Sequence, residues 1–514
     1  MSKTIIIIGA GLAGLSAALQ AAENGCNVKL VSSLPSERAQ SVMAEGGINA
    51  ALNTKDENDS PEEHFTDTIK AACGLADPNA VWGMTQAAPE LVHWLLKLGV
   101  KFNMSGYDDV DLRNFGGQKK KRTAFAQSDT GKQIMTAMID AVRRKEASGM
   151  VERFSHHSFL TLRLCGNICC GCVIRDEYSQ ETVELPGDAV IVATGGMHGL
   201  FGNTTGSLSN TGEVTAELFR LGVPLANGEM IQYHPTTVKC GGKRMLISEA
   251  ARGEGGRLFA MKDGKQWYFM EEKYPELGNL MPRDITAREI WKVSHESEVF
   301  LDMTEISEEI ISNKLSGLAD DCMTYLHKDI RKEPVSVLPG IHYFMGGILV
   351  DEQHRTPIQN LYAAGECCAQ YHGANRLGGN SLLGALYGGR VAAKSAREQA
   401  DVVDLSCATQ IDFPPASQIS EIKQLNKVMQ ETMGVVRNEN TLLNGIQTVQ
   451  ALTGNLPLLG MAVLKSALAR KESRGAHWRE DYPKSNDDDY LKTTVARFDG
   501  KQIQISFVPV PERR

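Results

Sequence analysis

The chain begins with a run of isoleucines that breaks into closely spaced glycines. Residues 4–8 are Thr-Ile-Ile-Ile-Ile. Gly9, Gly11 and Gly14 follow, and residues 15–23 are typical of a helix. In a strand–turn–helix unit of this kind, the first glycine allows a tight turn, the second lets the backbone approach a pyrophosphate, and the third lets the helix pack closely on the strand. The N-terminus is therefore predicted to bind a dinucleotide.

The second predicted strand, residues 27–31, ends in Ser32-Ser33. An acidic residue about 20 positions after the glycine motif would bind the ribose of a nicotinamide dinucleotide. Because this chain carries hydroxyl groups there, the sequence argues against a nicotinamide dinucleotide as the ligand. Flavin adenine dinucleotide stays open, since a serine can also hydrogen-bond a ribose, though less strongly than a carboxylate.

Length and charge exclude several classes of protein. A chain of 514 residues predicts two or three domains. The formal net charge of −8, without a basic run interleaved with aromatic residues, argues against nucleic-acid binding. The short basic run 119–122 is expected to be a solvated face. No apolar stretch has the length of a membrane span, so we expect no direct membrane insertion and a cytoplasmic protein.

Eleven cysteines without a disulfide-framework spacing suit a reducing compartment. The cluster Cys165, Cys169, Cys170 and Cys172 fits neither an iron–sulfur nor a zinc pattern. Residues 162–174 are typical of two strands around the turn Gly166-Asn167, and adjacent residues of a strand point to opposite faces. The sequence therefore predicts no metal site.

Strand signals that resemble the first one return late in the sequence. Residues 188–196 and 360–366 are each apolar and then break into small residues. They predict one nucleotide-binding sheet assembled from distant segments, with another domain inserted between them. From 417 to 471 the apolar residues recur at helical spacing, and residues 493–510 return to short strands. The predicted domains are 1–228 with 346–405, an inserted domain 229–345, a helical domain 406–485 and a short C-terminal β segment 486–514.

Hydrogen-bond donors and cations gather in the insertion and where the chain returns to the sheet. They occupy the segments 232–236, 248–256, 282–284, 341–343 and 372–382. Taken singly, each histidine or arginine there has an ordinary structural interpretation.

Together with three further segments, this ordered set resembles one family. The further segments are Ser-Val-Met-Ala-Glu-Gly-Gly at 41–47, the stretch 115–126 that starts Phe-Gly-Gly, and the stretch 472–481 that starts Glu-Ser-Arg-Gly-Ala-His. The chain resembles, over almost its whole length, the flavoprotein subunit of succinate dehydrogenase and fumarate reductase, in the superfamily that includes L-aspartate oxidase. The resemblance implies an α/β fold: a discontinuous Rossmann-like FAD-binding domain, an inserted α+β capping domain and a C-terminal helical domain.

The resemblance also implies which residues bind FAD. Glu366 would hold the ribityl chain, and the glycines would let the backbone approach the ring system. The full set of predicted FAD contacts is Gly9, Ala10, Gly11, Leu12, Ala13, Gly14, Ser32, Ser33, Ser41, Glu45, Gly46, Gly47, Ala193, Thr194, Gly195, Glu213, Glu366, Ser381 and Leu382.

For the substrate, the resemblance implies a small dicarboxylate, fumarate or succinate. Arg376 would clamp one carboxylate, and a second group of residues would twist the other out of conjugation. That second group is His342, His234 and Ser248. Hydride would pass from flavin N5 to one alkene carbon.

In the family, the proton for the other carbon comes from the arginine that matches Arg283, and a relay matching Glu249 and Arg252 supplies it. A guanidinium is an improbable acid because it normally stays protonated. Glu249 and Arg252 are three residues apart, so on a helical turn they would share a face.

Three positions depart from the family pattern. Gln40 stands where covalent members carry the histidine that bonds to the flavin, so we expect non-covalent FAD. Covalent attachment in the family supports succinate oxidation, and its loss favours fumarate reduction. Ser248 replaces the usual threonine and keeps the hydroxyl group. Glu213 replaces an aspartate near the flavin, which changes the reach of that carboxylate.

Alternative functions stay open. L-Aspartate oxidase shares the arginine and histidines but needs an acid to seat an ammonium group, and residues 114–126 offer basic residues instead. A reductase of another α,β-unsaturated carboxylate is a further alternative. A redox-inert binding or electron-relay flavoprotein would be expected to lack at least one of four residues, and none of them is missing. These residues are Glu249, Arg283, His342 and Arg376. As electron donor, the resemblance implies an iron–sulfur subunit, through which the chain could associate with the inner face of a membrane. A reduced free flavin or a thiol system stays open as an alternative donor.

Overall fold

A five-stranded parallel sheet forms the centre of the molecule in this computed structural model, which describes residues 2–106, 109–401, 413 and 418–514. The strand order is β20-β10-β1-β2-β6, and neighbouring strands are parallel. The strands are β1 (Thr4–Ile8), β2 (Asn27–Ser32), β6 (Val151–Ser155), β10 (Ala189–Val192) and β20 (Leu361–Ala363). The prediction that distant segments build one sheet is confirmed. The residues Ile5, Ile6 and Ile7 are completely buried, as expected for a parallel sheet covered on both faces.

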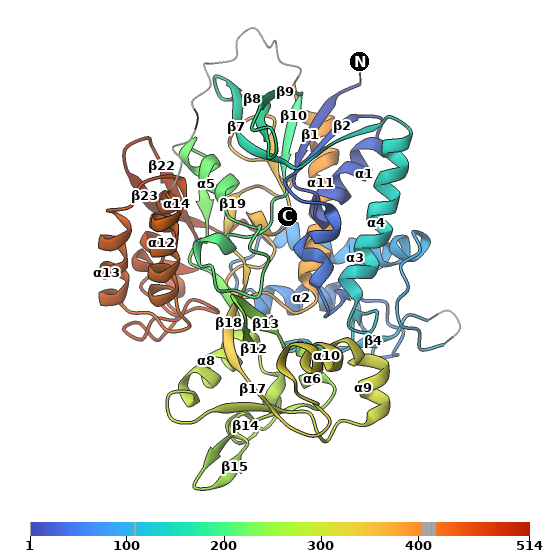
Figure 1. The fold of residues 1–514 in the computed structure, drawn as a ribbon, viewed down its shortest axis with the longest axis vertical. Helices are drawn as coiled ribbons and strands as arrows, with labels where there is room; N and C mark the ends of the chain where they lie inside the picture. The colour runs from blue at the N-terminus through green and yellow to red at the C-terminus, as the bar shows by residue number, and fades with distance from the viewer. Residues whose placement is uncertain (1, 107–108, 402–412, 414–417) are drawn as a thin grey trace.

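Helices cover one face of this sheet, and an antiparallel sheet covers the other (Figure 1). Helix α1 packs closely on α11, because Gly389 has no side chain: a Cβ there would lie 2.3 Å from the Ala13 carbonyl oxygen. A Cβ on Gly14 would lie 1.9 Å from the Gly9 carbonyl oxygen, which confirms the role given to the third glycine. The helices on this face are α1 (Leu12–Glu23), α3 (Pro78–Lys97), α4 (Thr130–Ala147) and α11 (Asn380–Gln399), and α2 (Pro61–Ala71) packs on α3.

The covering antiparallel sheet consists of β7 (His157–Cys165), β8 (Ile168–Asp176) and β9 (Thr182–Pro186). The first two strands form a hairpin around Gly166-Asn167, as the sequence predicts. Cys169 and Cys172 are completely buried and belong to the apolar core between the two sheets. These two cysteines therefore pack as small apolar side chains.

The insertion has a core of its own and lies at the lower end of the molecule in Figure 1. One of its sheets joins β13, β12 and β18, and another joins β15, β14, β16 and β17. Its strands are β12 (Ile231–Cys240), β13 (Lys243–Leu246), β14 (Arg257–Lys262), β15 (Lys265–Trp267), β16 (Val299–Asp302), β17 (Val335–Ser336) and β18 (Leu338–Phe344). Its helices are α6 (Glu249–Gly253), α7 (Phe269–Lys273), α8 (Arg283–Val293), α9 (Glu308–Lys314) and α10 (Ser316–Asp321).

The C-terminal part contains the predicted helices and strands. Helices α12 (Ile419–Thr432), α13 (Glu439–Val449) and α14 (Asn455–Ala469) pack around one apolar cluster. Strands β22 (Lys492–Phe498) and β23 (Ile503–Pro509) then extend a sheet that also holds β11 (Leu225–Ala226), β19 (Gly347–Leu349) and β21 (Cys368–Ala369). The predicted start of the helical domain at residue 406 lies outside the described residues.

The basic run 119–122 differs from the prediction at its last residue. Arg122 is completely buried, with its Nη2 atom 2.8 Å from the Asp59 carboxylate and 3.0 Å from that of Asp67. The expectation of a solvated face is therefore wrong for Arg122. Two carboxylates from distant segments compensate its charge, which the local sequence could not show.

Among the described residues, no helix is both long enough and apolar enough to cross a membrane.

Candidate active site

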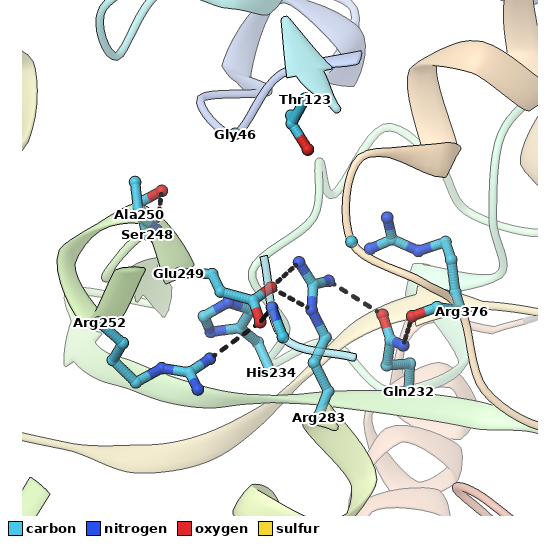
Figure 2. A network of polar contacts seen from close by, with 12 residues as sticks. Gly46, Thr123, Gln232, His234, Ser248, Glu249, Ala250, Arg252, Arg283 and Arg376 are labelled. Atoms are coloured by element: carbon cyan, nitrogen blue, oxygen red, sulfur yellow. Dashed lines mark hydrogen bonds and ion pairs between the residues drawn. The ribbon is translucent and has the colours of Figure 1, made fainter. Parts of the chain in front are cut away.

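A buried ion pair between two helix starts forms the centre of the candidate site. Glu249 is the first residue of α6 and Arg283 the first of α8. One Glu249 oxygen, Oε2, accepts hydrogen bonds from Arg283 Nε at 2.8 Å and from Nη2 at 2.6 Å (Figure 2). The structure therefore brings together the predicted proton donor and its predicted relay.

Arg252 approaches the same carboxylate from within α6. Its Nη2 atom lies 3.5 Å from Glu249 Oε1, and both residues are buried. The expected shared face is confirmed, since one helical turn separates the two side chains. The Gly116 N–H donates a further hydrogen bond of 3.1 Å to Glu249 Oε1. Glu249 is thus surrounded by donors from three separate segments.

These donors keep the Glu249 carboxylate ionised. Burial alone would raise its pKa, but the charges of Arg283 and Arg252, together with hydrogen bonds from Arg283 and Gly116, hold the pKa below its usual value. A carboxylate that stays charged can accept a proton from one guanidinium and pass it to the other.

Gln232 links this ion pair to the second predicted arginine. Its Oε1 atom accepts a 3.1 Å hydrogen bond from Arg283 Nη1, and its Nε2 atom donates one of 2.9 Å to the Arg376 carbonyl oxygen (Figure 2). Gln232 is a site residue that was not predicted from the sequence. The strand period of two, which places residues 232 and 234 on the same face of one strand, was the available signal.

Arg376 is a buried cation whose guanidinium is incompletely paired. It lies just before α11 and is 3% exposed. Its guanidinium carbon lies 4.2 Å from the centre of the Tyr343 ring, and its Nε atom has no hydrogen-bond partner among the described residues. Burial, together with the charge of Arg283, lowers the pKa of Arg376 to about 9. A buried guanidinium with an unused donor suits the binding of an anion.

The two predicted substrate histidines lie side by side. The rings of His234, on β12, and His342, on β18, have centres 5.1 Å apart. His234 Nδ1 lies 3.1 Å from the Thr236 carbonyl oxygen, and His342 Nδ1 lies 2.8 Å from the Thr205 hydroxyl. Burial and the nearby arginines hold the pKa of both imidazoles well below its usual value. Both rings are therefore neutral near pH 7 and can act as hydrogen-bond donors without a charge.

The buried histidines predict a folded state that is sensitive to acid. Burial lowers the pKa of His64 to about 3 and of His354 to about 4, and it also lowers the pKa values of His234, His342 and His372. Below pH ~6.5 the unfolded chain binds protons that the native state rejects, so stability falls by about 1.4 kcal/mol per pH unit for each such histidine. The thermal unfolding midpoint should drop between pH 7.5 and pH 5.5, mostly below pH 6.5. A midpoint that stays constant over this range would contradict the neutral histidines.

Ser248 and Glu45 lie together at the edge of the site. The Ser248 hydroxyl caps α6 by accepting a 3.4 Å hydrogen bond from the Ala250 N–H. Burial and the charge of Asp321 raise the pKa of Glu45 to about 8, while a hydrogen bond with Ser248 opposes this rise. Glu45 is therefore largely protonated near pH 7. The contact of Ser248 with a substrate stays a prediction.

The predicted FAD residues of the first half surround the carboxyl end of the central sheet. A Cβ on Gly9, whose φ is +111°, would lie 2.3 Å from the Ala193 carbonyl oxygen, so the glycine turn contacts the segment after β10. Ser41 accepts a 3.3 Å hydrogen bond from the Leu12 N–H. Ser32 is buried at the end of β2, and its hydroxyl has no partner among the described residues. An unpaired buried hydroxyl beside a glycine turn fits the ribose of a dinucleotide.

The late FAD residues lie at the same sheet edge. Glu366 follows β20, and one of its carboxylate oxygens accepts a 3.1 Å hydrogen bond from the Phe344 N–H. The same oxygen lies 3.6 Å from Nε2 of the buried His198. Ser381 and Leu382 are in the first turn of α11, where free N–H groups favour an electron-rich ligand.

No hydrogen bond between the Glu213 side chain and these groups is recorded among the described residues. Glu213 is an exposed residue at the start of α5 (Glu213–Arg220), and its backbone N–H donates to the Thr211 hydroxyl at 3.3 Å. The contact of Glu213 with FAD stays a prediction.

Comparison with known proteins identifies the family. Residues 4–382 match the FAD binding domain family, and residues 452–513 match the family described as fumarate reductase flavoprotein C-term. The succinate dehydrogenase flavoprotein subunit of Bacillus subtilis is 38% identical, and the match covers 100% of this chain and 98% of the relative. The chain belongs to the succinate dehydrogenase and fumarate reductase flavoprotein family. It is therefore an FAD-dependent oxidoreductase.

Two further members of this flavoprotein family are similar to the chain over nearly its whole length. The flavoprotein subunit of the 8-methylmenaquinol:fumarate reductase of Wolinella succinogenes is 32% identical, with 100% of this chain and 92% of the relative covered. The solved FrdA chain of E. coli quinol fumarate reductase has a TM-score of 0.90 at 27% identity, with 99% of this chain and 97% of that chain covered. The fold is thus shared from one end of the chain to the other.

Proposed function

We propose that this flavoprotein interconverts fumarate and succinate, with fumarate reduction favoured. One observation carries the proposal: a buried hydrogen-bond network that joins Glu249 to Arg283, Arg283 to Gln232, and Gln232 to the backbone of Arg376. A small dianion needs fixed cations and neutral donors in a site shielded from water, and the network supplies the cations. The relatives named as succinate dehydrogenase and fumarate reductase subunits support this substrate class.

In this proposal, Arg376 and the two histidines bind the substrate. The Arg376 guanidinium presents its fork to one carboxylate, and its stacking on Tyr343 keeps it in place. His342 and His234 donate to the second carboxylate and hold it out of the plane of the double bond. Ser248 contributes its hydroxyl to the same carboxylate. Loss of conjugation makes the alkene a better hydride acceptor.

Arg283 is the proposed proton donor. FAD, when bound, would supply the hydride, and the Arg283 guanidinium would give a proton to the second alkene carbon, which yields succinate. Arg252 then passes a proton through the Glu249 carboxylate to Arg283, which leaves Glu249 ionised again. Burial is the main cause that lowers the pKa values of Arg376 and Arg252, the neighbours of Arg283.

Gln40 supports non-covalent FAD. Its Oε1 atom accepts a 2.6 Å hydrogen bond from the Ser207 N–H and a 3.3 Å bond from Asn210 Nδ2. An amide offers no nucleophilic ring nitrogen for a bond to the flavin. Acid precipitation of the purified protein should therefore release all of the yellow cofactor into the supernatant. Flavin that stays with the protein pellet would contradict this prediction.

The separate apolar core of the insertion supports the domain division given above. We propose that residues 229–345 form the capping domain over the FAD-binding domain of 1–228 and 346–405. In this division, residues 406–485 form the helical domain and 486–514 the short C-terminal β segment. For the electron source, we propose an iron–sulfur subunit as partner, in line with relatives that are named subunits.

Turnover with a reduced dye tests the proposed reaction. The FAD-loaded chain should oxidise the dye when fumarate is added and form one succinate for every two electrons. L-Aspartate with oxygen is the control substrate, and a panel of other α,β-unsaturated acids tests the specificity. Hydrogen peroxide from aspartate, without succinate from fumarate, would show an aspartate oxidase instead.

A further inference from the structure

The segment between β10 and α5 carries a threonine that contacts a predicted substrate residue. The Thr205 N–H donates a 2.9 Å hydrogen bond to the Ile341 carbonyl oxygen, which fixes the segment against β18. The Thr205 hydroxyl then lies 2.8 Å from Nδ1 of His342, the next residue along that strand. No other side-chain hydrogen bond of His342 is recorded in the described part of the chain.

This contact determines where the His342 proton resides. A neutral imidazole carries one N–H and one free lone pair, so its two nitrogens have opposite roles. The Thr205 hydroxyl has a single proton and two acceptors in reach: Nδ1 at 2.8 Å, and the Ile341 carbonyl at 3.4 Å. The carbonyl already accepts the Thr205 N–H and lies farther away. Assigning the hydroxyl proton to the shorter contact, with Nδ1, places the imidazole proton on Nε2.

We infer that Thr205 is a positioning residue that holds His342 as the Nε2–H tautomer. The Nε2–H group of His342 then donates to a substrate carboxylate. This inference rests on the proposed function, which places a dicarboxylate at His342. The opposite tautomer would point a lone pair at the carboxylate and weaken binding by repulsion. Thr205 thus acts on the substrate only through the ring of His342.

A pair of matched substitutions separates the hydroxyl from the shape of the side chain. Thr205→Val keeps the branched shape and removes the hydroxyl, whereas Thr205→Ser keeps the hydroxyl and removes one methyl group. Malonate, a dicarboxylate that cannot accept a hydride, is titrated into each FAD-loaded protein, and binding is followed by the change in flavin absorbance. We expect Thr205→Val to bind malonate at least about tenfold more weakly than the wild type, and Thr205→Ser to stay within about threefold.

The KM for fumarate should follow the same order as malonate binding. FAD content and thermal midpoint, measured on all three proteins, should stay at the wild-type level. Thr205→Val binding within about threefold of the wild type would overturn the inference. Equal weakening in both variants would also overturn it, because packing would then be the cause. Failure of the wild type itself to bind malonate would instead refute the dicarboxylate site.

Discussion

Substitution of Arg283 by alanine is expected to lower kcat for fumarate reduction by at least about a thousandfold while FAD stays bound. A positioned general acid contributes about 10²–10⁴ in rate, and Arg283 is the proposed proton donor. Its side chain makes two hydrogen bonds to Glu249 and one to Gln232. The substitution therefore also breaks the hydrogen-bonded connection between Glu249 and Gln232. The measurement is steady-state turnover with a reduced dye, together with the flavin-to-protein ratio.

Two further variants separate the loss of the proton donor from a loss of charge or stability. Arg283→Ala leaves Glu249 buried without its main counter-charge, which costs roughly 3–5 kcal/mol of stability. Arg283→Lys keeps a positive charge near Glu249 but lacks the guanidinium fork, and it should still lose at least about a hundredfold in kcat. Lys292→Ala, an exposed change on the same helix α8, should keep full activity. If Arg283→Ala kept more than about a tenth of the wild-type kcat, Arg283 would not be the proton donor.

Substitution of Arg376 by methionine is expected to weaken dicarboxylate binding by about 10²–10³, which corresponds to roughly 3–4 kcal/mol. The effect should be this large because the lost guanidinium is buried and has an unused donor. Gln232 contacts only the backbone carbonyl of Arg376, so the Arg283 network should survive the change. The dissociation constant for malonate and the KM for fumarate measure the effect.

Arg390 on α11 provides the matched control for Arg376. Its guanidinium carbon lies 4.8 Å from the centre of the Trp94 ring, so both arginines stack on an aromatic residue. Arg390→Met should leave malonate binding unchanged, because this residue lies outside the site. Equal weakening by both substitutions would show that lost stacking, rather than lost anion binding, explains the result.

The central sheet and the helical bundle could be predicted because their signals are local. The isoleucine run of β1 and the glycines after it specify strand, turn and helix within twenty residues, and the spacing of Leu425 and Met429 specifies a helical face. The return of the sheet after the insertion could also be read, since β10 and β20 repeat the apolar pattern of β1.

The site could be predicted only through the resemblance, and its connections could not be predicted at all. Glu249 and Arg283 start separate helices 34 residues apart, and no periodicity shows that they will form a two-pronged ion pair. Gln232 and Thr205 were missed for a related reason: their roles depend on which side chain they face across two elements. The burial of Arg122 was misjudged because Asp59 and Asp67 come from another part of the chain.

An experimental structure of the FAD-loaded protein with malonate bound would test the central claim most directly. We expect one carboxylate on the Arg376 guanidinium, the other near His342 and His234, and Arg283 within about 3.5 Å of the carbon between them. The flavin ring should lie on the opposite side of that carbon. A ligand bound elsewhere, or an Arg283 side chain turned away from it, would contradict the proposed reaction.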